Sequence, residues 1–117
     1  MKLLTTEIIK KMPLPDTITD NNNAPIRVKF FGGSSYSLHV ISAEAILESG
    51  ETVKLSDIKD NKVKDINLFG YVTGLAVDEW RYISFNELKD IKFPPFGLGI
   101  ERDKYPLYDT VKELKKG

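Results

Sequence analysis

The sequence contains no cysteine, one histidine (His39) and one tryptophan (Trp80). The absence of cysteine excludes disulfides and thiol catalysis, and a single histidine excludes a zinc site built from His and Cys ligands within one chain. An excess of charge is also missing, because 17 basic and 17 acidic side chains give a formal net charge of +0. A nucleic-acid or membrane-surface binder would therefore need a local basic patch. No apolar run approaches the roughly 20 residues that cross a membrane.

These absences predict a cytoplasmic protein without a cofactor or a metal site. A length of 117 residues fits one domain, 1–117, that is large enough to bury its own core. The order of apolar and turn-forming residues predicts an α+β fold. We expect an antiparallel sheet of about five to six strands in hairpins, with short helices near the N- and C-termini.

The strands are expected in three hairpins. The first joins 26–31 to 36–41 through the sequence Gly-Gly-Ser-Ser, and we favour a turn there over an anion-binding nest. The third joins 66–75 to 80–85. The second is less clear, because the region from Ser42 to Gly50 fits either a strand that turns back at Ser49-Gly50 or a short helix. We favour the hairpin of 43–47 with 51–55.

Helices are predicted at 5–12, 86–91 and 109–116. The side chains available as their N-caps are, in chain order, Thr5 or Thr6, Ser84, and Asp109 or Thr110. The charged segment 56–65 has the composition of a solvated connection. The proline-rich segment 92–106 should hold no long regular element.

Three stretches, taken in order, carry a resemblance to a known family. They are MKLLTTEIIKKMP at the start, VKFF at 28–31, and the run FGYVTGL, YISFNEL and GLGIERD across 69–103. Together they resemble domain of unknown function 2958, a small bacterial family often encoded on plasmids, phages and other mobile elements. The matching positions are Lys29, Phe30, Phe31, Phe69, Gly70, Gly74, Leu75, Tyr82, Ser84, Glu87, Leu88, Gly97, Leu98, Ile100, Glu101, Arg102 and Asp103.

The chain departs from the family pattern in two places. The family tends to carry a Trp-rich strand where this chain has SSYSLHV, and the segment 43–65 is longer or altered. The resemblance implies an origin on a mobile element and transfers no established activity.

The charges of GLGIERD admit two interpretations. Arg102 could present its fork to a phosphate or carboxylate while Glu101 and Asp103 orient it. Alternatively, the stretch is an ion-paired turn whose acids accept nearby backbone N–H groups. We favour the structural interpretation, because an anion site usually recruits more than one basic residue.

Other candidates also have a structural interpretation that we favour. His39 lies in an alternating strand, on one face with Ser37 and Ile41, and is expected to be a partly exposed strand histidine rather than part of a nucleophile system. Phe69 and Tyr71 resemble the base-stacking strand of RNA readers but are expected in the core. Surface charge, rather than a metal site, is expected for Asp78, Glu79, Glu87, Glu101 and Asp103.

The aromatic content is larger than a core of this size needs, so some rings should be exposed. Tyr105 and Tyr108 are two such candidates. The contact residues that we predict for a partner are Trp80, Arg81, Tyr82, Glu101, Arg102 and Asp103. The leading hypothesis is a non-enzymatic binding protein of a mobile element, for example a counter-defence inhibitor that occludes a host protein or sequesters a signal molecule.

Two alternatives belong to other classes. One is a nucleotide-binding protein, small-molecule-binding protein or enzyme that uses Arg102 as an anion clamp with Glu101 or Asp103 as acid or base. The other is a single-strand nucleic-acid binder, which the neutral charge disfavours.

Overall fold

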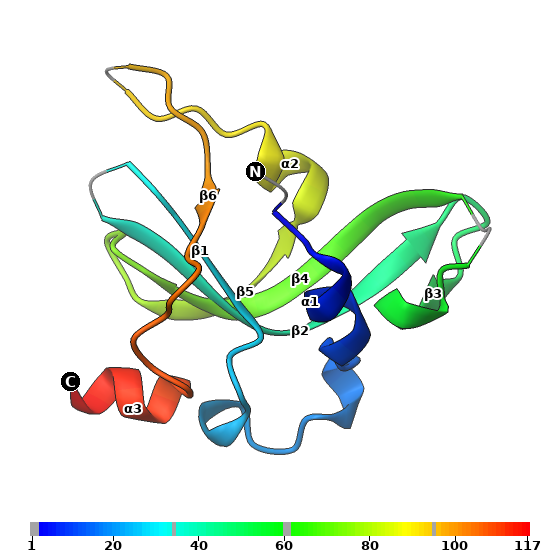
Figure 1. Ribbon diagram of the computed structural model, residues 1–117, viewed down its shortest axis with the longest axis horizontal. Coiled ribbons are helices and arrows are strands. Elements are labelled where there is room, and N and C mark those ends of the chain that lie inside the picture. Colours follow the sequence, from blue (N-terminus) through cyan, green and yellow to red (C-terminus); the bar gives the residue numbers. More distant parts are fainter. Residues whose placement is uncertain (1–2, 34, 60–61, 95) are drawn as a thin grey trace.

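The computed structural model describes residues 3–33, 35–59, 62–94 and 96–117. Its elements along the chain are α1 (Thr6–Lys11), η1 (Pro15–Thr17), η2 (Asn21–Asn23), β1 (Val28–Gly32), β2 (Tyr36–Leu47), β3 (Thr52–Val53), η3 (Leu55–Asp57), β4 (Val63–Thr73), β5 (Glu79–Ser84), α2 (Phe85–Lys89), β6 (Glu101–Arg102) and α3 (Val111–Lys116). The fold is α+β, as predicted (Figure 1). No helix of the described ranges is both long and apolar enough to traverse a bilayer.

One antiparallel sheet contains all six strands, in the order β5-β4-β2-β1-β6, with β3 paired to β2. Consecutive strands form the three predicted hairpins: β1 with β2, β2 with β3, and β4 with β5. The hairpin interpretation of 43–55 is thus confirmed, since Ala45 is opposite Val53. Ser34 of the Gly-Gly-Ser-Ser turn lies outside the described residues.

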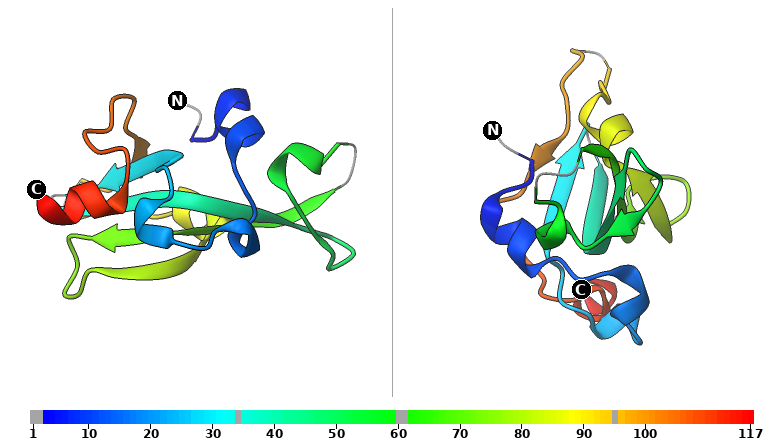
Figure 2. Two further views of the ribbon diagram at one scale, coloured as in Figure 1. Left: turned by 90° about the horizontal axis from the view of Figure 1, so that it is seen from below. Right: turned by 90° about the vertical axis from the view of Figure 1, so that its right-hand side faces the viewer.

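The main hydrophobic core covers one face of the sheet. Phe30, Leu38 and Leu68 come from three neighbouring strands and are fully buried. Met12, directly after helix α1, and Leu88 of helix α2 belong to the same cluster. Figure 2 shows α1 and η3 together on one side of the long strands β2 and β4. Burial of these side chains is the main driving force that holds the helices on the sheet.

A β-bulge changes which residues of β2 face this core. The register with β4 shifts between Val40 and Ser42, so one residue has no partner on β4. Before the bulge, Leu38 and Val40 belong to the main core; after it, Ala43 and Ala45 do. A single inserted residue reverses the alternation of a strand in this way.

The expectation that His39 is partly exposed is wrong, because its exposed fraction is 4%. His39 does lie on the face opposite the main core, beside Lys29 of β1 and Tyr71 of β4. Around His39 and Tyr71 this second face is also covered, which local alternation does not reveal. Helix α3 lies on it, with the Lys115 Nζ atom 4.8 Å from the centre of the Tyr71 ring.

The predicted helices and caps are confirmed in each case. The side chains of Thr5, Ser84 and Thr110 accept hydrogen bonds from backbone N–H groups three residues later. Such caps satisfy donors that have no partner within the helix.

Segment 56–65 is not wholly a solvated connection, because β4 begins at Val63; Asp60 and Asn61 lie outside the described residues. The segment 92–106 holds only the two-residue strand β6, which pairs with β1. Pro95 of that segment is not described.

Candidate functional site

The predicted contact residues divide between the two edges of the sheet. Strand β5 ends the sheet on one side and β6 ends it on the other. On β5 lie Trp80, Arg81 and Tyr82, and on or directly after β6 lie Glu101, Arg102 and Asp103. Three strands separate the two groups, so the fold offers two candidate surfaces rather than one.

The first surface is an aromatic ladder on the second face, formed by Phe69, Tyr71, Trp80 and Tyr82. The Phe69 ring lies 5.5 Å from Trp80 and 4.7 Å from Tyr82, and Tyr71 lies 5.2 Å from Trp80, all between ring centroids. Cross-strand aromatic pairs of this kind stabilise a hairpin. Exposure rises toward the edge strand, from 9% at Tyr71 to 56% at Tyr82. Only the outer end of the ladder therefore offers much ring surface to a ligand.

At the opposite edge, the three charges of GLGIERD do not point the same way. Arg102 is opposite Phe30, a residue of the main core, and Glu101 is opposite Phe31 on the second face. Because side chains alternate along a strand, Arg102 faces away from Glu101 and Asp103. The half-buried Arg102 has a buried Nε atom without a hydrogen-bond partner among the described residues. The arrangement that an Arg102 clamp with flanking acids requires is thus not present within this strand.

Asp103 contacts Lys29 instead. The Lys29 Nζ atom lies 3.5 Å from Asp103 Oδ2, and the Asp103 backbone N–H donates to the Lys29 carbonyl at 2.9 Å. Asp103 Oδ1 accepts a hydrogen bond from the Tyr105 backbone N–H, also at 2.9 Å. These contacts hold the segment after β6 against β1, as the structural interpretation predicts for one of the two acids, Asp103.

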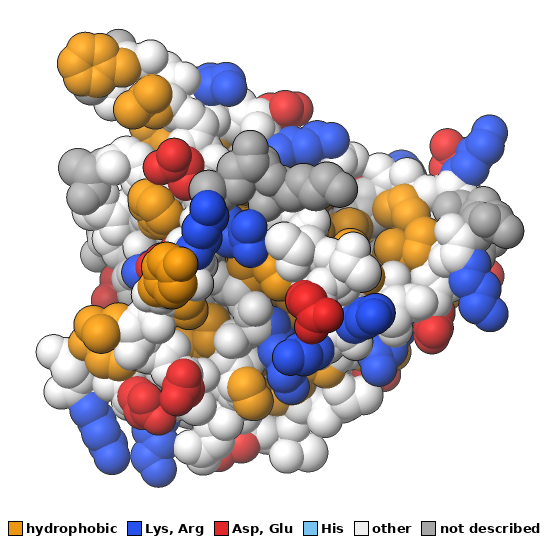
Figure 3. All heavy atoms as spheres, in the orientation of Figure 1, with side chains coloured by type: hydrophobic (Ala, Val, Ile, Leu, Met, Phe, Trp, Pro, Cys, Tyr) orange, Lys and Arg blue, Asp and Glu red, His pale blue; other side chains and the backbone are white. Residues whose placement is uncertain are grey.

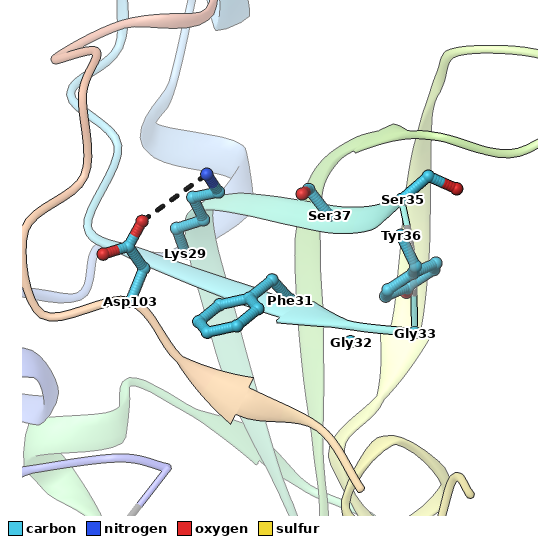
Figure 4. A pocket seen from close by; sticks show the side chains of 8 residues that line it. All are labelled: Lys29, Phe31, Gly32, Gly33, Ser35, Tyr36, Ser37 and Asp103. Atoms are coloured by element: carbon cyan, nitrogen blue, oxygen red, sulfur yellow. Dashed lines mark ion pairs between the residues drawn. The ribbon is translucent and has the colours of Figure 1, made fainter. Parts of the chain in front are cut away.

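A shallow hollow of about 320 Å³ lies beside this ion pair (Figure 4). Its lining comes from the β1–β2 hairpin and from Asp103, and consists of Lys29, Phe31, Gly32, Gly33, Ser35, Tyr36, Ser37 and Asp103. In Figure 4 the Lys29 side chain extends toward Asp103 at one end of the hollow. The hollow offers a cation, hydroxyl groups and the edge of a phenyl ring. In the sequence Lys29 stands out only among the positions that match the family, and no site role is predicted for it, because its partner is 74 positions away in the chain.

His39 is buried next to the same ion pair. The pKa of His39 is lowered from 6.5 to about 4, mainly by burial; the positive charge of Lys29 contributes to the lowering and the carboxylate of Asp103 opposes it. Its Nε2 atom is buried and has no hydrogen-bond partner among the residues that the structure describes. The imidazole is therefore neutral at pH 7 and suits a structural position better than that of a general base.

Apolar side chains are exposed along the β6 edge. Phe96 (83%), Leu98 (65%), Tyr105 (89%) and Leu107 (80%) flank β6 on both sides and are called the β6 margin below. Figure 3 shows hydrophobic side chains along this side of the molecule, interspersed with charged ones. The predicted exposure of Tyr105 is confirmed, whereas Tyr108 is half-buried. The sequence signal for this exposure is the high Pro and Gly content around Phe96. A segment rich in these residues forms no regular strand or helix that would direct alternate side chains into the core.

No protein-family model matches this chain, and no curated protein or solved structure matches it either.

Proposed function

We propose that this chain is a non-enzymatic binding protein that covers part of a partner protein with its β6 margin. The observation that carries the proposal is the concentration of exposed apolar side chains at Phe96, Leu98, Tyr105 and Leu107. Large exposed apolar side chains next to charged ones are typical of surfaces that bind other proteins. The Lys29–Asp103 contacts support this role, because they hold the segment that presents Tyr105 and Leu107.

The setting that we propose is a mobile genetic element, and the partner is a bacterial host protein. The resemblance to domain of unknown function 2958 supports this setting. An inhibitor of a host defence is one concrete form, since occlusion of a surface needs contact residues and no catalytic group.

The test is a comparison of proteins captured from a bacterial host lysate by three forms of the chain. The wild type is compared with a Phe96→Ser, Tyr105→Ser double variant and with a control that carries Val63→Ser and Leu75→Ser. The control removes exposed apolar groups at a distance from β6. Thermal melting of all three forms shows that each is folded.

The expected result is a protein that the wild type and the control retain and the β6-margin variant loses. The interaction is then reconstituted with purified components by calorimetry. Retention by all three forms, or enrichment of no protein over an unrelated bait, would contradict the proposal.

A second candidate function is capture of a small anionic molecule in the hollow beside Lys29. It is favoured by the combination of Lys29, Ser37 and Phe31 along one lining, which could contact an acidic group and an apolar one. Titration of ¹⁵N-labelled protein with nucleotides and aromatic carboxylates tests it. Saturable shifts at Lys29 that a Lys29→Met variant loses would support it, and shifts that stay linear with concentration would exclude it.

A further inference from the structure

Strand β5 is an edge strand with little of the protection that natural edges carry. It pairs with β4 over six consecutive residues, Glu79 to Ser84, without a bulge, and within the described ranges no strand pairs with its outer side. Natural edge strands are commonly short, bulged, charged, or interrupted by proline or lysine, and of these features β5 has only the charges of Glu79 and Arg81. Strand β6 at the other edge is only two residues long. The backbone N–H and C=O groups on the outer side of β5 can therefore accept another strand.

The two charges of β5 restrict which strand can bind there. Glu79 and Arg81 lie on the same face and form an ion pair of 3.2 Å between Oε1 and Nε, with both side chains about half exposed at 49%. Charged side chains on an edge strand oppose pairing with strands that do not complement them. An incoming antiparallel strand must place a positive side chain opposite Glu79 and a negative side chain opposite Arg81.

The strand that meets this requirement is β5 itself. We propose that two copies of the chain pair through β5 in an antiparallel register that places Trp80 opposite Trp80 of the second copy. This register places Glu79 opposite Arg81 of the second copy, and does so twice because the pairing is symmetric. Shifting the register by two residues would place Arg81 opposite Arg81 in one direction and Glu79 opposite Glu79 in the other, and like charges opposite each other are unfavourable.

The aromatic ladder supports the same pairing. On the second face Trp80 stacks on Phe69 and meets Tyr71 edge to face, and this face continues into the second copy when the sheets join. The two indole rings would then extend the ladder across the interface, with Cα atoms about 4.5–5.5 Å apart as in any antiparallel pair.

Charge reversal tests the register directly. An Arg81→Glu variant carries two acids on β5, and a Glu79→Arg variant carries two bases. In a dimer of either variant alone, like charges would lie opposite each other across the interface. A mixture of the two variants restores both complementary pairs. The residues are half exposed, so a surface ion pair can be replaced with little effect on folding, which thermal melting checks.

Sedimentation equilibrium of the wild type across micromolar to millimolar concentrations should show a monomer–dimer equilibrium. Each single variant should be monomeric over the same range, the mixture should be dimeric, and the double variant carrying both reversals should dimerise like the wild type. A wild type that stays monomeric at millimolar concentration would overturn the proposal. So would single variants that dimerise as well as the wild type, because the interface would then lie elsewhere.

A cross-linking experiment remains decisive if a reversal variant fails to fold. The chain has no cysteine, so an introduced cysteine can form a disulfide only between molecules. Mixing Glu79→Cys with Arg81→Cys should give a cross-link between the two different variants, and a Tyr105→Cys control should give none. Equal cross-linking of all combinations would contradict the register. This inference does not depend on the partner proposed for the β6 margin, which lies at the opposite edge.

Discussion

Lys29 and Asp103 are joined twice, once through the backbone and once through their side chains. The Asp103 N–H donates to the Lys29 carbonyl at 2.9 Å, and Lys29 Nζ lies 3.5 Å from Asp103 Oδ2. Asp103 then accepts the Tyr105 N–H. The end of GLGIERD thus fixes the C-terminal segment to β1.

Replacing Asp103 with alanine should lower the free energy of unfolding by about 1–2 kcal/mol, because a half-buried ion pair and a backbone acceptor are both lost. Urea denaturation measures the change. The matched control is Glu101→Ala, since Glu101 is an exposed acid two residues earlier, and its effect should stay within about 0.5 kcal/mol. Equal losses for the two variants would show that the contacts of Asp103 contribute little.

Asp65 connects β4 to the start of α2, and its charge should matter for stability. Its carboxylate accepts hydrogen bonds from the Ser84 hydroxyl, the Asn86 N–H and the Ile66 N–H. Burial alone would raise the pKa of Asp65 above 3.8, but these hydrogen bonds outweigh burial and lower it. The stabilisation is therefore present above pH 3.8 and is lost as the pH falls through the lower pKa of the folded state.

An Asp65→Asn variant should lose about 1–2 kcal/mol of stability at pH 7, measured by chemical denaturation. The difference in stability between the variant and the wild type should shrink as the pH falls below 4, because the carboxyl group of the wild type then becomes protonated and loses its charge. The exposed Asp57→Asn variant serves as the control. A pH-independent difference would show that the charge of Asp65 is not what stabilises the junction.

His39 should make the protein less stable in mild acid. Its pKa is about 4 in the folded state against an ordinary value of 6.5, so the unfolded chain takes up the proton first as the pH falls. Stability is full above pH 6.5 and declines until pH 4, by about 3 kcal/mol in total from this residue. Thermal unfolding at a series of pH values measures the decline.

A His39→Leu variant should show little of that decline between pH 6.5 and 4. At pH 7 it should be at least as stable as the wild type, because leucine removes a buried Nε2 atom that has no hydrogen-bond partner among the described residues. If the pH dependence of stability is the same in this variant as in the wild type, the group whose protonation destabilises the protein is not His39.

Gly70 should tolerate no side chain, since a Cβ atom there would collide with the backbone carbonyl of His39 on the neighbouring strand. We expect Gly70→Ala to cost more than about 2 kcal/mol, because the strands must separate beside the bulge. The control is Gly99→Ala, where the nearest atom would be 3.7 Å away and the change should be nearly neutral. Equal stability of the two variants would contradict the close approach.

The sequence was informative where neighbouring residues decide the structure. The three hairpins follow from alternating apolar residues around Gly-Gly-Ser-Ser, Ser49-Gly50 and the 75–79 loop, and the helix starts follow from Thr5, Ser84 and Thr110. These are local effects of backbone freedom and capping.

The remaining features depend on contacts between distant parts of the chain. His39 alternates with apolar neighbours as a half-exposed residue would, and only the folded structure shows that it is buried, beside Lys29, Tyr71 and Asp103. Likewise, β5 and β6 lie at opposite edges because β6 returns to β1, a pairing of residues about 70 positions apart. No periodicity within either strand encodes that order, so the predicted contact residues could not be divided correctly from the sequence.

The return of the last segment to the first strand also orders the folding of the chain. Strands β1 and β2 pair in a hairpin of adjacent segments. By contrast, β6 pairs with β1, and Thr110 with Pro25, across a large part of the chain. Contacts between distant residues form slowly because a long loop must close first. The Tyr71 ring therefore lacks the Lys115 side chain that lies over it until α3 docks. A chain cut short before Thr110 would lack α3 and leave the Tyr71 ring uncovered, and such a product should be more prone to aggregation and to proteolysis.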